Sequence, residues 1–448
     1  MAQGSSPLAD LRVGPTHRLE PESGKELLTG REAPTPTPGV DPREPAAHPS
    51  RRSLRGLDWF IFFVADVQTG FGPFIAVYLT TQKWTQVDIG LVLSIGGFIA
   101  LLGQMPGGAL VDAARSERFV AGVALAFIAA AALAYASWPI FPVVLGAATM
   151  HAAASCVLGP CIAAISLGLV GHAAFGDRLG RNARFAALGN GIAAAAMGAI
   201  GYLFSPRAVF IVTAGLLIPT LFALSRIRPG EVDPERAHGA LPKIKPDKSP
   251  TGLRDLLSKR PLLILAGCIM LFHLANGAML PLMGSVVTMR SSEWATILIA
   301  ACIVVPQLIV AAISPQVGYY AQLWGRRIFL LIAFTALTVR GALFATVVDP
   351  YLIVLVQVLD GITAACLGVM VPLMVADITR GTGRFNLAQG IIGTAVGIGA
   401  SISPTLAGYL IDHFGSHVAF LGLAAIASVG LCATWMLMPE TRPRPDAV

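Results

Sequence analysis

Long apolar runs recur along this chain from about residue 57 to residue 438. A helix that crosses the ~30 Å hydrocarbon core of a bilayer needs ~20 apolar residues, and each run is long enough. Charged residues make up only 13% of the chain, whereas soluble proteins average ~25%. We therefore predict an all-α integral membrane protein rather than a β-barrel. The spans, about twelve in number, are predicted at 57–80, 86–112, 118–137, 139–170, 184–204, 207–226, 261–289, 294–322, 327–347, 350–377, 385–411 and 416–438.

A polar, proline-bearing segment separates the sixth span from the seventh and divides the chain into two halves of six spans. The first residues are also polar and proline-rich, which is typical of a disordered tail. The predicted organisation is a disordered tail, a first six-helix bundle, a linker, a second six-helix bundle and a short C-terminal tail. The corresponding ranges are 1–55, 56–226, 227–260, 261–438 and 439–448.

The basic residues gather on one side of the predicted spans. Of 32 Lys and Arg residues, the only ones on the other side or within spans are Lys83, Arg207, Arg290 and Arg340. The positive-inside rule then places both termini and the linker in the cytoplasm. The formal charge of +7 is thus explained by topology, and no nucleic-acid partner is expected. Arg340 lies toward the outer end of its span, where its long side chain is expected to reach the interface.

Two internal echoes indicate a duplication. Gly108 and Asp112 close the second span, and Gly318 and Gln322 stand 210 residues later at the close of the eighth, with basic residues after both pairs. A second echo relates the fifth span to the eleventh by aligning Gly189 and Gly198 with Gly390 and Gly399. The two halves are therefore predicted to be pseudo-symmetric.

With this layout the chain resembles the major facilitator superfamily, from about residue 55 to residue 440. The stretch holding Gly108, Asp112, Arg115 and Arg118 resembles that family's signature loop, Gly-x-x-x-Asp-Arg/Lys-x-Gly-Arg-Arg/Lys. It departs from the pattern at Ala113, which replaces the first basic residue. The second copy keeps Gly325, Arg326 and Arg327 but has Gln322 in place of the acid. The resemblance implies two six-helix bundles and transport by alternating access.

A glycine pattern known from drug–proton antiporters also appears, on the eleventh span instead of the fifth. It runs Gly390-x8-Gly399-x3-Ser403-Pro404-x2-Ala407-Gly408. Small residues at this spacing also serve close helix packing, and the sequence leaves both interpretations open.

Four titratable side chains fall near the middle of every third span: Asp66, His151, His273 and Asp360. A charge at mid-bilayer costs ~3 kcal/mol or more, so each needs a reason. The resemblance implies that these four helices line a central cavity. We expect Asp66, His273 and Asp360 to couple proton movement, and Gln68, His151, Asn276 and Asp360 to line the substrate cavity. The alternative is that each is a neutral or paired packing residue.

The charged connections are interpreted as a cytoplasmic gate. Asp112 is expected to meet a helix N-terminus or an arginine such as Arg184 or Arg384, and Asp112→Asn to change transport rate more than affinity. The predicted gate residues are Gly108, Asp112, Arg115, Arg118, Gly318, Arg326, Arg327 and Arg384.

We predict a secondary transporter of the bacterial inner membrane, with a small organic solute, protons and the lipid bilayer as its partners, acting as a monomer. Proton-coupled efflux of a drug-like solute is favoured. A proton-coupled uptake permease for a small metabolite, or a non-transporting sensor on the same fold, remain as alternatives. No metal-ligand spacing or phosphate-binding Gly-Lys-Ser/Thr loop is present, so no cofactor is expected. No catalytic triad in a plausible context appears, so an enzyme is not predicted.

Overall fold

The computed structural model describes residues 49–69, 72–240, 252–283, 292–347 and 349–443. All regular structure in these ranges is helical. Ten of the helices there are long and apolar enough to cross a membrane. The protein is therefore a multi-pass helical membrane protein, as predicted.

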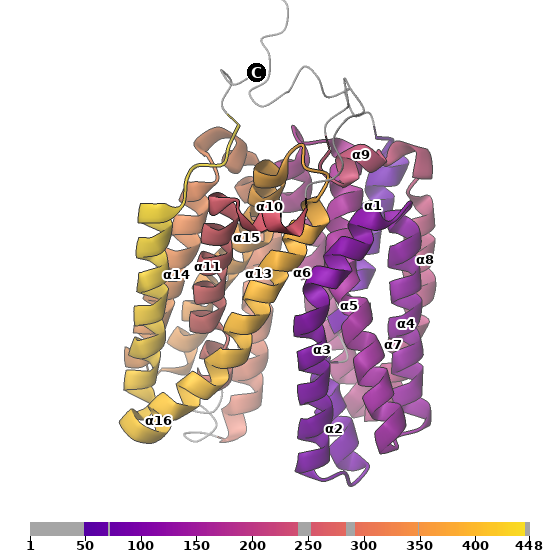
Figure 1. The fold of residues 1–448 in the computed structure, drawn as a ribbon. Coiled ribbons are helices and arrows are strands. Elements are labelled where there is room, and N and C mark those ends of the chain that lie inside the picture. The colour runs from indigo at the N-terminus through magenta and orange to yellow at the C-terminus, as the bar shows by residue number, and fades with distance from the viewer. Residues whose placement is uncertain (1–48, 70–71, 241–251, 284–291, 348, 444–448) are drawn as a thin grey trace, which may run out of the picture. The chain divides into compact units, whose positions relative to one another are not determined.

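The first half contains eight helices (Figure 1). Thr85 and Ser116 begin two of them by accepting hydrogen bonds from the backbone of Asp88 and Phe119, which is typical of N-cap residues. The helices are α1 (Arg51–Thr69), α2 (Gly72–Thr81), α3 (Gln86–Ala113), α4 (Glu117–Ser137), α5 (Phe141–Val170), α6 (Phe175–Leu203), α7 (Pro206–Gly215) and α8 (Leu217–Arg226).

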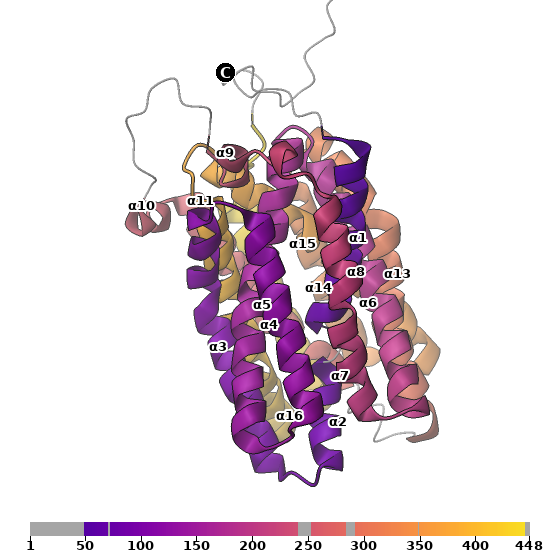
Figure 2. The ribbon, with the colours of Figure 1, turned by 90° about the vertical axis from the view of Figure 1, so that its right-hand side faces the viewer.

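In the described part of the chain, the linker forms three short helical pieces and the second half forms five long helices. The linker pieces are η1 (Pro229–Glu231), α9 (Pro234–Ala237) and α10 (Leu253–Leu257). The second half contains α11 (Arg260–Asn276), α13 (Ser292–Trp324), α14 (Arg327–Thr346), α15 (Pro350–Thr379) and α16 (Phe385–Leu437). In Figures 1 and 2, α9 marks one end of the helix bundle, which we call the linker end.

Helix α16 has 53 residues, so it would be about 80 Å long if straight. That is more than twice the ~30 Å core of a bilayer. Gly415 interrupts it with φ of 83°, a left-handed backbone that favours glycine. A Cβ on Gly422 would lie 2.8 Å from the side chain of Leu410, so the two limbs run back along each other from this point. The two limbs correspond to two predicted spans, and predicted span one is divided between α1 and α2.

Two predicted boundaries are wrong. α1 begins at Arg51, so residues 51–55 are helical and do not belong to a disordered tail. α6 begins at Phe175, nine residues before the predicted start at Arg184. The arginines in that stretch had marked it as a connection, but they lie on the helix and find partners there. Residues 1–48 lie outside the described residues.

Each half has its own apolar core. One buried cluster is formed by first-half helices and extends to Ala237 in the linker. The other is formed mostly by second-half helices and also takes in Leu167, Phe175 and Ala187 from α5 and α6. The halves meet where α3 packs on α16 and α6 packs on α13, contacts that we call the seam.

Glycines bring the backbones together at the seam, and the contacts repeat between the halves. A Cβ on Gly180 would lie 2.5 Å from the backbone oxygen of Ser314. The position 210 residues later, Gly390, has the matching contact with the backbone oxygen of Gln104. Gly180 therefore corresponds to Gly390 and Gly189 to Gly399. The predicted alignment of Gly189 with Gly390 is wrong, and one offset of 210 residues relates both echoes.

Candidate functional site

A buried charge cluster joins three helices of the second half. The guanidinium of Arg340, on α14, forms an ion pair with Asp360 on α15 through Nη1. Its Nη2 donates to Asn276 Oδ1 on α11 and lies 3.3 Å from Met279 Sδ. The side chain of Arg340 is only 2% exposed, whereas that of Asp360 is 25% exposed. Asp360 lies ten residues into α15, about 15 Å along the helix axis from its start.

Arg340 does not reach the membrane interface as its position suggested. It points inward because Asp360 and Asn276 satisfy its charge, and Phe344 lies under the guanidinium with 5.9 Å from Cζ to the ring centroid. Two predicted site residues, Asn276 and Asp360, are thus brought together by a third that sequence reasoning set aside. An acid ten residues into the next helix was the available signal for this pairing.

The other predicted membrane site residues lie elsewhere. His273 is three residues before Asn276, and its ring contacts that of Phe272 with centroids 5.5 Å apart. His151, on α5 of the first half, has Nε2 3.5 Å from Ser155 Oγ. Asp66 and Gln68 lie on α1, but their side chains are outside the described ones.

Asp112 lies at the seam and caps a helix of the opposite half. Its Oδ1 accepts hydrogen bonds from the backbone N–H of Asn386 at 3.1 Å and from Asn386 Nδ2 at 2.9 Å. Its Oδ2 accepts from the backbone N–H of Leu387 at 2.8 Å. These are N–H groups that the first turn of α16 leaves without helical partners, and a negative charge is favourable there. Of the predicted partners of Asp112, the helix N-terminus is confirmed.

Arg184 bonds elsewhere. Its Nε donates to the backbone oxygen of Ala311 at 2.8 Å. Arg384 is the residue before α16, and its backbone N–H donates to Thr382 Oγ1 at 3.2 Å.

The remaining predicted gate residues divide between the seam and their own halves. Gly108 and Gly318 lie at the seam, where a Cβ would strike the backbone oxygens of Asn386 and Gly176, respectively. Arg115 is exposed. The other three bond within their own halves: Arg118 to Leu224 O, Arg326 to Asp377 and Arg327 to Trp435 O.

The linker bridges the two halves at the same end. Toward the first half, the backbone N–H of Asp233 donates to Gly168 O at 3.2 Å. Toward the second half, the backbone oxygen of His238 accepts from the N–H of Phe385 at 3.1 Å. His238 Nε2 lies 3.1 Å from Glu117 Oε1. The Glu117 carboxylate raises the pKa of His238 above its usual value, against the opposing effect of burial.

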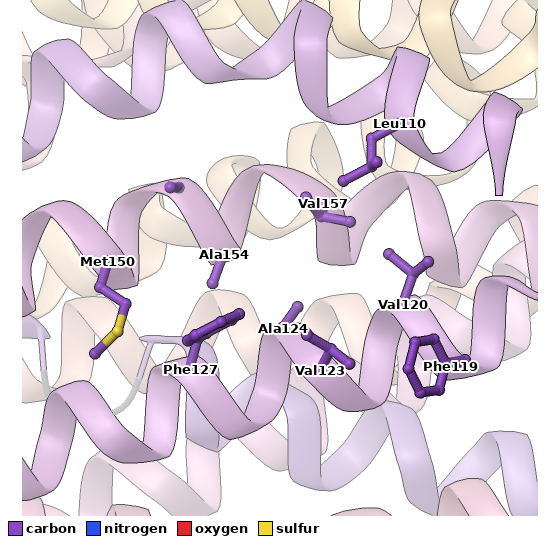
Figure 3. A pocket seen from close by; sticks show the side chains of 10 residues that line it. Leu110, Phe119, Val120, Val123, Ala124, Phe127, Met150, Ala154 and Val157 are labelled. Atoms are coloured by element: carbon purple, nitrogen blue, oxygen red, sulfur yellow. The ribbon is translucent and has the colours of Figure 1, made fainter.

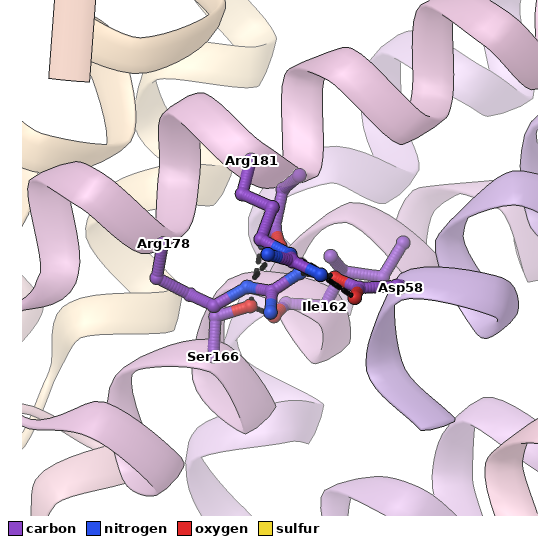
Figure 4. Close-up of polar contacts among 6 residues, drawn as sticks. Asp58, Ile162, Ser166, Arg178 and Arg181 are labelled. Carbon is purple, nitrogen blue, oxygen red and sulfur yellow. Dashed lines mark hydrogen bonds and ion pairs between the residues drawn. The ribbon is translucent and has the colours of Figure 1, made fainter. Parts of the chain in front are cut away.

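A buried ion-pair network that sequence reasoning missed ties α1 to α6 (Figure 4). Asp58 accepts from Arg178 Nη2 and from Arg181 Nη2, each at 2.6 Å. Arg178 Nε donates to Asn182 Oδ1 at 2.6 Å, and Asn182 Nδ2 donates to Ser166 Oγ on α5 at 2.8 Å. Arg178 and Arg181 are three residues apart, so they share a helix face, which could have indicated a common acid.

The family model described as Major Facilitator Superfamily matches residues 59–312 and again residues 266–448. The chain belongs to the major facilitator superfamily.

Relatives within the major facilitator superfamily occur in two strains of Mycobacterium tuberculosis, CDC 1551 / Oshkosh and ATCC 25618 / H37Rv. Each is described as an uncharacterized MFS-type transporter, is 39% identical over 396 residues, and is matched over 87% of this chain and 94% of its own length. The fold is similar to the crystal structure of the human organic anion transporter MFSD10. The TM-score is 0.65 at 14% identity, and the match covers 88% of this chain and 100% of that one.

An apolar pocket of about 440 Å³ lies among α3, α4 and α5 of this superfamily fold (Figure 3). Leu110, Val120, Phe127, Met150 and Val157 are among its lining residues. Phe127 is 51% exposed and Leu110 is 53% exposed on the outside of the first half. A solute site needs a few polar groups to orient its ligand, and no polar side chain lines this pocket. The Arg340 cluster is therefore the better candidate site.

Proposed function

We propose that the protein is a proton-coupled secondary transporter with twelve spans in two six-helix bundles, exporting a small organic solute across a bacterial inner membrane. The observation that carries this proposal is the pair of Arg340 and Asp360. A charge at this depth is costly, and membrane proteins retain such residues chiefly for ion and substrate pathways. The partial exposure of Asp360 leaves one side of the pair open to a proton or a solute.

The pair supplies a simple coupling device. While Asp360 is ionised, its charge balances Arg340, whose side chain is almost fully buried. A proton on Asp360 removes that balance and leaves a buried guanidinium without a counter-charge, which is strongly unfavourable. The helices α14 and α15 must then shift, or an acidic group of the solute must replace the carboxylate. Proton binding and solute binding are thereby linked at one guanidinium.

The seam supports alternating access. Asp112 caps α16 from the opposite half, and the linker bonds to both halves at the same end. With the linker on the cytoplasmic side, this arrangement corresponds to a closed cytoplasmic face. Opening that face requires these contacts to separate, which is a rigid-body change of the kind that inverted-repeat transporters use.

The test is transport in proteoliposomes with an imposed pH gradient. Asp360→Asn is expected to abolish solute accumulation driven by the gradient while leaving solute exchange without a gradient measurable. Asp412→Asn, an exposed acid near the turn of α16, is the matched control and should transport normally.

Gradient-driven transport that survives in Asp360→Asn moves the coupling role to Asp66 or His273. If no condition yields solute flux but the protein binds a cytoplasmic partner, the result supports a sensor. Accumulation with the opposite gradient polarity supports an uptake permease.

A further inference from the structure

A groove between α1 and α8 carries four arginines over an aromatic floor. It encloses about 740 Å³ and lies toward the linker end of the first half, where α1 begins and α8 ends. Arg51, Arg52 and Arg55 line one side and Arg226 the other. Figure 2 shows α1 and α8 side by side at this place. All four side chains are exposed.

Gly56 sets the geometry of the groove. A Cβ there would lie 2.9 Å from Arg226 Cβ and 3.1 Å from the backbone oxygen of Ala223. The two helix backbones therefore approach closely beneath the arginines, and the arginines of α1 and α8 converge on the same space. A side chain at residue 56 would force the three arginines of α1 away from Arg226.

The lining of the groove is strongly basic. Among the residues that the structure describes, none of these four arginines forms an ion pair, and no acid lines the groove. Nearby arginines differ in this respect, because Arg181 pairs with Asp58 and Arg228 with Glu231. Four unpaired guanidinium groups facing one space are complementary to a multiply charged anion.

The floor of the groove is apolar and exposed. Trp59 is 51% exposed and Phe222 is 65% exposed. The guanidinium of Arg226 lies over the Phe222 ring, with 5.8 Å from Cζ to the centroid. Exposed aromatic residues next to basic residues at helix ends are typical of the headgroup level of a bilayer. A ligand here meets cations at one end and aromatic surface at the other.

We propose that this groove binds an anionic phospholipid, with its phosphates on Arg51, Arg55 and Arg226 and its acyl chains along Trp59 and Phe222. The helix arrangement gives the occupant both a charged end and an apolar end, which a free phosphate lacks. The four arginines suit a headgroup with two phosphates, and basic pockets between transmembrane helices at the cytoplasmic face hold such headgroups. The site is separate from the Arg340 cluster, which belongs to the other half.

The test measures lipid binding to the full-length protein in detergent. Cardiolipin is the probe, and phosphatidylcholine and inorganic phosphate are the comparison arms. Arg55→Gln with Arg226→Gln should weaken cardiolipin binding about thirtyfold, because each arginine near the headgroups contributes about 1 kcal/mol. Arg254→Gln, an exposed arginine on α10 outside the groove, should leave binding unchanged.

Trp59 locates the lipid directly. Brominated cardiolipin should quench the part of the tryptophan fluorescence that Trp59→Phe removes, and the quenching should saturate with the binding curve. Equal binding by the double arginine variant, equal loss in Arg254→Gln, or quenching that does not involve Trp59 would overturn the proposal. Phosphatidylcholine that binds as tightly as cardiolipin, or inorganic phosphate that displaces cardiolipin at matched concentration, would also overturn it.

Discussion

The guanidinium of Arg184 donates to the backbone oxygen of Ala311 across the seam, at 2.8 Å. This oxygen is available because Pro315, four residues later in α13, has no N–H to bond it within the helix. A proline in one half thus exposes a carbonyl that an arginine of the other half uses. A hydrogen bond from a charged group contributes about 1.5–3 kcal/mol, which is enough to bias two conformations.

Arg184→Gln is therefore expected to shift the protein about tenfold or more toward a state open at the linker end. Spin labels at the exposed Arg115 and Leu323, on opposite halves, would report the change as a longer distance by electron resonance. Of the six cysteines only Cys432 is exposed, so only that one needs replacement. Arg207→Gln, an exposed arginine far from the seam in sequence, is the control. An unchanged distance distribution in Arg184→Gln would show that this bond does not hold the seam.

The two arginines on Asp58 should differ in their energetic weight. Asp58→Asn leaves Arg178, 3% exposed, without its counter-charge and should lower stability by about 3 kcal/mol or more. Arg181→Gln should cost at most about 1 kcal/mol, because its side chain is 54% exposed. Unfolding in mixed detergent by circular dichroism measures both. Similar losses for the two variants would contradict the assignment of Arg178 as the structural partner.

The Arg340 and Asp360 pair should show strong non-additivity. Asp360→Asn alone strands a buried cation and is expected to cost about 3–5 kcal/mol. Arg340→Met alone leaves the Asp360 carboxylate unpaired but partly exposed to water, so it should lower stability less. The double variant should be more stable than Asp360→Asn, because the stranded charge is gone. Thermal unfolding of the three proteins completes the cycle. Additive effects would mean that the two side chains do not interact.

His238 makes the linker contact sensitive to pH. Glu117 raises its pKa when the linker is docked, above the ~6.5 of an unpaired histidine. The stabilisation is therefore complete below about pH 6.5 and is lost as the pH rises through the higher pKa of the docked state. The thermal midpoint should fall between pH 6 and pH 8.5 more in the wild type than in His238→Gln. Glu117→Gln should flatten the profile in the same way. Parallel profiles in all three would exclude this pair as the cause.

Gly108 should not accept a side chain. A Cβ at this position would overlap the backbone oxygen of Asn386, so Gly108→Ala should cost about 1–3 kcal/mol by forcing α3 from α16. Gly90, also on α3, has nothing within 4 Å of its Cβ position. Gly90→Ala should instead be neutral or stabilise by up to about 1 kcal/mol. Melting temperatures measured side by side decide this. Equal shifts would indicate that the seam adjusts freely.

Sequence reasoning predicted the helical membrane fold, and it named a helix N-terminus as one of two possible partners of Asp112, because both follow from patterns along the chain. The length of each apolar run indicates which segments cross the membrane, and the signature loop places an acid at a helix end. The span boundaries that fall on described residues agree with the helix ends to within a few residues, except at the starts of α1 and α6. The division into two halves follows from the polar linker.

Pairing in three dimensions was beyond that reasoning. Arg340 was assigned to the interface because its own span was considered without Asp360 of the next helix. Arg178 and Arg181 were interpreted as loop residues because charge was taken as the sign of a connection, although both lie on α6 and form ion pairs with Asp58. The repeat at Gly189 was aligned by matching residues 180–185 with residues 381–385, and only the matching backbone contacts of Gly180 and Gly390 showed the offset.

The Asp112 cap on α16 also offers a way to measure how often the linker end opens. The backbone amides of Asn386 and Leu387 are bonded to a carboxylate that belongs to the other half. When the halves part, these two amides lose their acceptor and meet water. Their hydrogen–deuterium exchange should therefore proceed only during the open intervals, and its rate should rise with turnover. The exchange rate of these two amides would then report how often the linker end opens, without an attached probe.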